Sequence, residues 1–392
     1  MIKSWIAYDI KELEKKKLLS SAKNLYKSKI LSEEQWGKIK ENYTSKLYSP
    51  SIFIRVLFFI LTLIGLSTIS GPLALILSIN DFEDLRIAFL LFGVVFITVT
   101  DFVLIQKNHH YLSGVTEAGI YIGLSFIAFG VLASEPNNML IYPLVGFILS
   151  SIAAVRYLNL LGLVATFLFF GWILFQLCIT IGGIMEALIP FVFMFVFGLT
   201  YWSCTKLEKK LTSVVFEDAF IVAKTLSLFI VYLAGNYYVV RELSIELMNL
   251  HLAEGEDIPF AFLFYVFTVL VPIAYLYFGI KKRSLLFIRT SLLTLALSVI
   301  TLKYYFSLGM PMLTITLSGA ILIIISFLIF RYLRQVQHGF TSEKLLHDKW
   351  SSQDLTAIIA SQTLGGNKVP TTENDTTFKG GEFGGGGAGS NW

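Results

Sequence analysis

Residues 158–179 read LNLLGLVATFLFFGWILFQLCI, a run of 22 residues without a charged side chain. A helix of about 20 apolar residues crosses the roughly 30 Å hydrocarbon layer of a membrane, and it satisfies its own backbone hydrogen bonds without water. Comparable runs follow one another from Arg55 to Phe330, with only short polar interruptions. The sequence therefore predicts an all-α, polytopic integral membrane bundle.

The composition of the whole chain agrees with a lipid environment. Apolar residues make up 55% and charged residues 15%, against about 25% charged in soluble domains, and the mean hydropathy is +0.70. The ten-residue alternation of membrane β-strands is absent. The net charge of +4 comes from Lys and Arg gathered at helix ends and at the N-terminus, which favours a role in topology over nucleic-acid binding. No secretory signal peptide is visible, so we expect the first helix to be retained.

We expect ten spans. The boundary between the fourth and fifth spans rests on a short polar corner at 156–159, and the boundary between the fifth and sixth rests on the pair Gly182-Gly183. The spans are predicted at roughly 56–79, 87–105, 115–133, 139–155, 158–179, 184–204, 219–240, 259–280, 285–302 and 309–330.

The distribution of basic residues predicts the orientation of these spans, because cytoplasmic loops are enriched in Lys and Arg. The loops on the other side are mainly acidic, with only Arg86, Arg241 and Lys303. Both termini are therefore predicted in the cytoplasm. The loops on the basic side contain Lys107, Arg156, Lys206, Lys209, Lys210, Lys281, Lys282, Arg283, Arg331 and Arg334.

Residues 1–50 precede the spans (51–330) and have a helical pattern. Ser32 and Gln35 form a capping-box pattern that predicts a short helix with Trp36 and Ile39, after an earlier apolar stripe. The segment is predicted to be a cytosolic helical hairpin. It either lies against the membrane or the bundle, or docks a protein partner.

Two cytosolic pieces are expected beyond the spans. Residues 331–364 have a broken apolar stripe and are predicted to be an amphipathic helix. Residues 365–392 end in GGEFGGGGAGSNW and cannot bury enough surface to offset their ordering entropy, so we expect disorder. Phe383 and Trp392 either form a peptide that a partner captures or belong to a low-complexity tail.

Two segments resemble known families. The segment LYKSKILSEEQWGKIKENY, followed by membrane helices, resembles a family of bacterial polytopic membrane proteins with a domain of unknown function. Leu31, Ser32, Glu34 and Gln35 match the turn pattern of this family. Lys29 replaces the glycine often found before this pattern. The glycine-rich end is similar to the Trp-terminated tails of TPM-domain membrane proteins, which implies a shared partner for such tails.

Enzyme signatures are missing from the sequence. We find no Walker A loop, dinucleotide-binding glycine pattern, HExxH, paired CxxC or GxSxG. The loop from Arg241 to Ile258 is predicted to be an interfacial helix, and its acidic cluster is typical of an outer loop more than of a metal site. We therefore expect no catalytic residues, no metal and no cofactor.

Charged residues inside spans are the best guide to a site, because a charge at the bilayer centre costs about 2.5–3.5 kcal/mol. The segment from Asp101 to Glu117 brings both acids together with His109 and His110 at the cytoplasmic edge. It is predicted to be either a proton or cation site, since histidine titrates near neutrality, or an ion-paired loop that only holds the hairpin together. Lys224, in the seventh span, is a further candidate residue for this ion or proton site.

Helix interruptions are the other feature of interest, because transporters bind substrates where membrane helices are broken. Candidate breaks are Gly71-Pro72, Pro190, Gly235-Asn236 and Pro272.

Two functions remain open. One is a scaffold or accessory subunit of a bacterial envelope complex in the inner membrane, with contacts through the hairpin or the tail. The other is a transporter or channel for a small substrate, with the 101–117 hairpin as a gate. The bacterial assignment rests on a composition rich in Phe, Ile, Leu, Tyr and Lys.

Overall fold

The computed structural model describes residues 5–27, 30–76, 82–133, 139–211, 213–247 and 256–305, with helical positions at 316, 319, 320, 323, 324, 327 and 331. The predicted helix at 331–364, the predicted disordered tail at 365–392 with Phe383 and Trp392, and most of the predicted span at 309–330 lie outside these residues.

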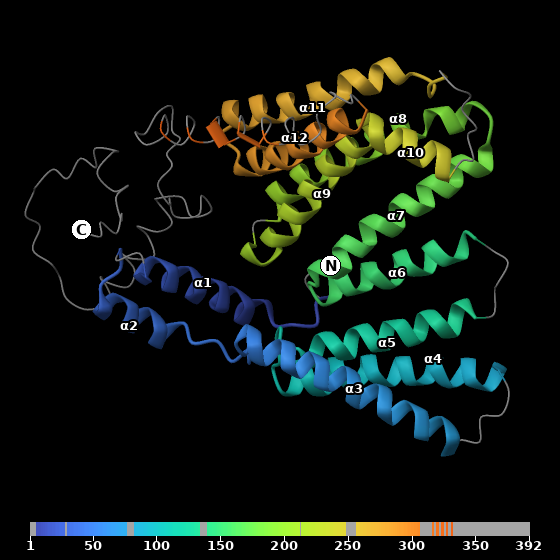
Figure 1. Cartoon of the computed structure of the whole chain (residues 1–392). Coiled ribbons are helices and arrows are strands. Elements are labelled where there is room, and N and C mark those ends of the chain that lie inside the picture. The colour runs from blue at the N-terminus through green and yellow to red at the C-terminus, as the bar shows by residue number, and fades with distance from the viewer. Residues whose placement is uncertain are drawn as a thin grey trace, which may run out of the picture. The chain divides into compact units, whose positions relative to one another are not determined.

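Within this part of the chain the secondary structure is helical, which confirms the predicted all-α class for these residues (Figure 1). The one β-bridge there joins Tyr48 to His110. The helices are α1 (Ile10–Lys27), α2 (Glu33–Asn42), α3 (Ile52–Ile76), α4 (Phe82–Val99), the π-helix η2 (Thr100–Lys107), α5 (Val115–Leu132), α6 (Ile141–Arg156), α7 (Leu160–Ile181), α8 (Ile184–Lys210), the 3₁₀-helix η3 (Val214–Phe216), α9 (Glu217–Gly235), α10 (Tyr237–Glu246), α11 (Ala261–Lys281) and α12 (Leu285–Tyr305).

Seven of the described helices are long and apolar enough to cross a membrane, so the protein is a multi-pass membrane protein. They are α3, α4 with η2, α5, α7, α8, α11 and α12. Two further predicted spans correspond to less clear elements. α6 is apolar but has 16 residues, and α9 contains three charged side chains in 19 residues.

The predicted helix interruptions need correction. α8 and α11 continue through Pro190 and Pro272, and α3 continues through Gly71 and Pro72. A membrane helix tolerates proline where neighbouring groups satisfy the freed carbonyl. The interruption lies at Asn236 instead, where α9 ends and α10 begins, as predicted for Gly235-Asn236. The turn at Gly182-Gly183 is also confirmed, since both glycines have positive φ.

The chain divides into two compact units. The first contains Met1–Glu14, Ser45–Leu276 and Leu286–Ser298, and the second contains Lys15–Thr44, Tyr277–Leu285 and Val299–Trp392. In the first unit consecutive helices pack in pairs, α4 with α5, α6 with α7 and α8 with α9, and α3 packs on α5 (Figure 1).

In the second unit, α1 and α2 form the predicted hairpin. Ala22, Leu25, Leu31 and Ile39 make its small buried core. The predicted capping box is confirmed, because the Gln35 backbone N–H donates to Ser32 Oγ at 3.2 Å and the Ser32 N–H donates to Gln35 Oε1 at 3.0 Å. We call Lys15–Thr44 the lysine hairpin.

Candidate functional site: the basic end of the membrane helices

The candidate site lies where η2, α5, the α6–α7 corner and η3 meet in the first unit. One buried apolar cluster joins these elements through Ile105, Ile120, Tyr157 and Val215. We call this the basic end of the helices, because η2, α6 and α8 finish there with Lys107, Arg156 and Lys210.

Asp101 lies at the basic end, buried inside η2, with 4% of its surface exposed. Arg156 at the end of α6 forms an ion pair with Asp101 by donating from Nη2 to Oδ2. Of the two alternatives for this segment, Asp101 is therefore ion-paired, although its partner lies on α6 and not in the 101–117 loop. Asp101 Oδ1 is buried and has no hydrogen-bond partner among the described residues. π-helical segments are rare and are often found at functional sites, and Asp101 lies in one.

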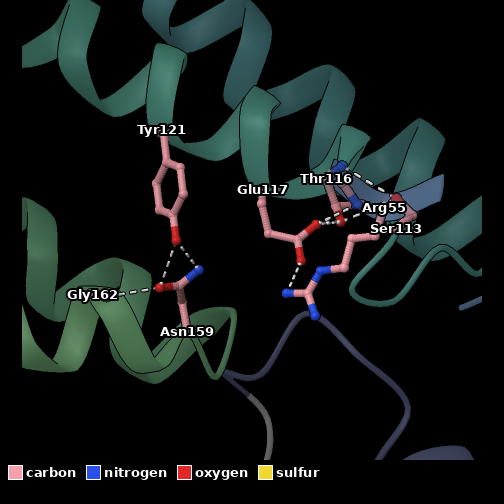
Figure 2. Close-up of polar contacts among 8 residues, drawn as sticks. Arg55, Ser113, Thr116, Glu117, Tyr121, Asn159 and Gly162 are labelled. Carbon is pink, nitrogen blue, oxygen red and sulfur yellow. Dashed lines mark hydrogen bonds and ion pairs between the residues drawn. The ribbon is translucent and has the colours of Figure 1, made fainter. Parts of the chain in front are cut away.

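Glu117 in the first turn of α5 is buried as well, and three donors surround its carboxylate (Figure 2). Oε2 accepts from the Gly114 N–H at 2.8 Å and from Thr116 Oγ1 at 2.9 Å, and Oε1 accepts from Arg55 Nη2 at 2.6 Å. A carboxylate is favourable at a helix N-terminus, where backbone N–H groups are unpaired. Glu117 therefore caps α5 and ties it to the first turn of α3.

A third polar contact lies at the same end and joins α5 to the start of α7. The Tyr121 hydroxyl and the Asn159 amide are joined by hydrogen bonds, and Asn159 Oδ1 also accepts from the Gly162 N–H at 2.7 Å (Figure 2). Asn159 is the N-cap of α7. The predicted corner between the fourth and fifth spans is thus held by a cap that reaches across to α5.

The N-terminal residues complete the basic end, which sequence reasoning did not foresee. We call Trp5–Glu14 the strap. The Ala7 N–H donates to the Arg156 carbonyl at 2.9 Å, and Arg156 Nη1 donates to the Trp5 carbonyl at 3.1 Å. Arg156 therefore holds Asp101 and the strap at once. The apolar strap residues Ile6, Tyr8 and Leu13 are buried in the same cluster.

Tyr8 of the strap is close to both acids. Burial, followed by the charge of Glu117 and smaller contributions that include Asp101, raises the pKa of the Tyr8 phenol far above its ordinary value. The phenol therefore stays neutral, and its ring packs edge-on against the Tyr111 ring.

Glu12 closes the base of the lysine hairpin. Its carbonyl accepts from Ser45 Oγ at 3.0 Å, and its carboxylate accepts from the Lys46 N–H at 2.8 Å. Tyr48 then donates its N–H to the His109 carbonyl at 2.9 Å. The chain thus leaves the first unit after Glu14 and rejoins it at Ser45. The two chain segments that flank the hairpin are held together by these hydrogen bonds.

The two histidines do not bind the acids. His109 is exposed and has a φ of 54°, whereas the His110 ring lies 5.0 Å from the Tyr48 ring. Burial lowers the pKa of His110 below its ordinary value of 6.5. In the described part of the chain, no group of three His, Cys, Asp or Glu side chains could hold a metal ion.

The predicted five-residue site is therefore only partly assembled. Asp101 and Glu117 bind different arginines, and Lys224 of α9 donates to Glu208 of α8 at 2.6 Å. Sequence reasoning found the acids and missed both arginines, because Arg55 and Arg156 stand at helix ends, where basic residues are expected for topology alone.

A second polar region lies between α9, α11 and α12. The sequence pointed to Asn236 in this region as part of a helix break, but not to the buried hydroxyls around it. Asn236 Nδ2 donates to the Tyr232 hydroxyl at 2.8 Å, and the Tyr237 N–H donates to Thr268 Oγ1 at 2.9 Å. On α12 the buried hydroxyl residues recur at helical spacing, and this pattern is visible in the sequence. The buried hydroxyl residues of this region include Ser227, Tyr232, Thr268, Thr290, Ser291, Thr294 and Ser298.

These features define the class of protein: a polytopic membrane protein whose buried charges at one end of the bundle are ion-paired. No family model, curated protein or solved structure matches the chain.

Proposed function

We propose that the protein is a non-enzymatic scaffold or accessory subunit of a bacterial envelope complex in the inner membrane. It has ten spans and both termini in the cytoplasm, so the basic end faces the cytoplasm. A protein partner binds through the lysine hairpin or the C-terminal tail, and lipid surrounds the bundle.

One observation carries this proposal: the acids and the lysine singled out as a transport site are each neutralised by a partner. Asp101, Glu117 and Lys224 are bound to Arg156, Arg55 and Glu208. A buried pair is costly to break, so these charges join helices more readily than they exchange protons or cations. Such fixed helices suit a protein that presents cytosolic segments to a partner.

Removal of the lysine hairpin tests the proposal. Because Ser45 Oγ lies 3.0 Å from the Glu12 carbonyl, Lys15–Thr44 can be replaced by a short Gly-Ser linker between Glu14 and Ser45. Full-length protein, the hairpin deletion and a deletion of 380–392 are purified in mild detergent, and co-purifying proteins are identified by mass spectrometry. The deletions should retain the melting temperature of the membrane unit, and at least one should lose a partner.

Two outcomes would refute the scaffold proposal. One is a full-length protein that purifies from native membranes with no stoichiometric partner. The other is a partner set that both deletions leave unchanged.

The buried hydroxyls between α9, α11 and α12 favour a second function, a transporter or channel for a small polar substrate. Helix interruptions within membrane bundles are typical of transporter sites, and Asn236 lies at one. Thr294→Val removes a buried hydroxyl at nearly constant volume, and Asp101→Asn removes the acid at the basic end. If neither variant changes any proton- or cation-dependent uptake in reconstituted vesicles, the transport function is rejected.

A further inference from the structure

The lysine hairpin has a strong excess of positive charge. Its 30 residues contain eight lysines and three glutamates, a net charge of +5, while the whole chain has a net charge of only +4. The hairpin has its own buried core, so these charges are displayed on a folded body. The excess is therefore a property of a surface and not of a disordered tail.

The lysines available on that surface are placed outside the core. Lys23 and Lys27 are exposed and lie one turn apart on α1, whereas Ala22 and Leu25 are buried between the helices. Lys40 is exposed near the end of α2. Residues four apart share one face of a helix, so Lys23 and Lys27 point the same way.

The lysine hairpin is joined to the first unit at both of its ends. The residues that flank the hairpin are held together within the first unit, where Glu12 accepts from Ser45 and Lys46. The first membrane helix, α3, begins at Ile52, seven residues after Ser45. Trp5 and Tyr48, on either side of the hairpin, are 54% and 44% exposed. Trp and Tyr are enriched where membrane and water meet.

We propose that the lysine hairpin docks on anionic phospholipid headgroups through a surface that includes Lys23, Lys27 and Lys40. The hairpin is covalently joined to a unit that crosses the membrane, whereas an acidic protein would have to be recruited. Lysines next to a membrane are attracted to anionic lipid within a Debye length, about 8 Å at physiological salt. This inference does not depend on the proposed scaffold function.

The test places a fluorophore on the hairpin of the full-length protein. Gly37 of α2 suits a probe, because a Cβ at this position meets no atom within 4 Å. Gly37→Cys is made with Cys178→Ala and Cys204→Ala, which removes the two native thiols. The labelled protein is reconstituted in nanodiscs of phosphatidylcholine alone or mixed with phosphatidylglycerol, each containing a lipid with a quencher on its headgroup.

Docking predicts strong quenching in the anionic nanodiscs, weak quenching in the zwitterionic ones, and loss of the difference at 1 M salt. Each of Lys23→Gln, Lys27→Gln and Lys40→Gln should lower the ratio of docked to undocked hairpin by about fivefold. Glu33→Gln with Glu41→Gln is the matched control, since it changes exposed charges of the opposite sign and should increase quenching. All variants should keep the helix content and melting temperature of the parent.

Equal quenching in the two lipids would overturn the proposal, and so would a response that the lysine variants leave unchanged. A change that appears only when an acidic protein is added would assign the surface to a protein partner instead. Loss of co-purifying proteins after hairpin removal is a separate result, so failure of lipid docking and failure of the scaffold proposal can be told apart.

Discussion

Gly114 shows how closely the chain segments approach at the basic end. Its φ is 89°, and a Cβ at this position would lie 2.0 Å from the Arg55 carbonyl oxygen and 2.9 Å from the Phe59 nitrogen. Only glycine combines this φ with such an approach of two backbones. The Glu117–Arg55 ion pair depends on that approach, because Glu117 also accepts from the Gly114 N–H.

Gly114→Ala should therefore lower the free energy of unfolding by at least about 2 kcal/mol. The measurement is thermal unfolding in detergent, followed by circular dichroism. Gly37→Ala is the control, since Gly37 lies in α2 and a Cβ there meets nothing within 4 Å. Alanine at position 37 should stabilise the hairpin by about 0.5–1 kcal/mol. Equal effects at the two positions would contradict the packing at Gly114.

His110 should make stability depend on pH. Burial lowers its pKa in the folded protein below 6.5, so the unfolded chain binds a proton more readily. Stability is then complete above about pH 6.5 and falls as the pH decreases toward the folded-state pKa. Melting temperatures measured from neutral pH to about pH 5 should fall less steeply in His110→Gln than in the parent. Equal slopes in His110→Gln and the parent would contradict this prediction.

At the scale of elements, α4 and α5 pack through glycine. A Cβ at Gly123 would lie 2.7 Å from Ile97 Cγ1, and one at Gly119 would lie 2.3 Å from Thr100 Oγ1. Small residues let membrane helices approach closely enough for van der Waals packing, since lipid provides no hydrophobic force between them. The close approach brings η2 and its Asp101 against the first turns of α5.

Gly123→Leu should therefore destabilise the bundle by about 2–3 kcal/mol, because the side chain has no space between the helices. Gly198→Leu is the matched control: it adds the same side chain in α8, where a Cβ meets nothing within 4 Å. Thermal unfolding in detergent compares the two. A smaller loss at Gly123 than at Gly198 would show that α4 and α5 are not packed as closely as described.

At the scale of the whole molecule, Arg156 connects the membrane helices with the N-terminus. Its guanidinium binds Asp101 and the Trp5 carbonyl, and its own carbonyl accepts from the Ala7 N–H. The strap therefore depends on the same side chain that neutralises the buried acid.

Arg156→Gln should cost about 2–3 kcal/mol, because it leaves the buried Asp101 charge without its partner. It should also expose the strap, so limited proteolysis near the N-terminus becomes faster. Lys38→Gln is the control, since it breaks the exposed Lys38–Glu34 pair and should leave the stability nearly unchanged. A strap that remains protected in Arg156→Gln would show that its apolar residues suffice to hold it.

The sequence alone determined the parts of this protein that depend on local chemistry. Uncharged runs long enough to cross a bilayer located the helices, and Ser32 with Gln35 located the start of α2, because hydropathy and capping act between neighbours in the chain. Only the tertiary structure decided which base meets each acid. Arg55 is 62 residues from Glu117 and Arg156 is 55 residues from Asp101, and no local pattern encodes such distances. The helix pairing and the close approach at Gly114 bring these charges together, and desolvation then makes each pair necessary.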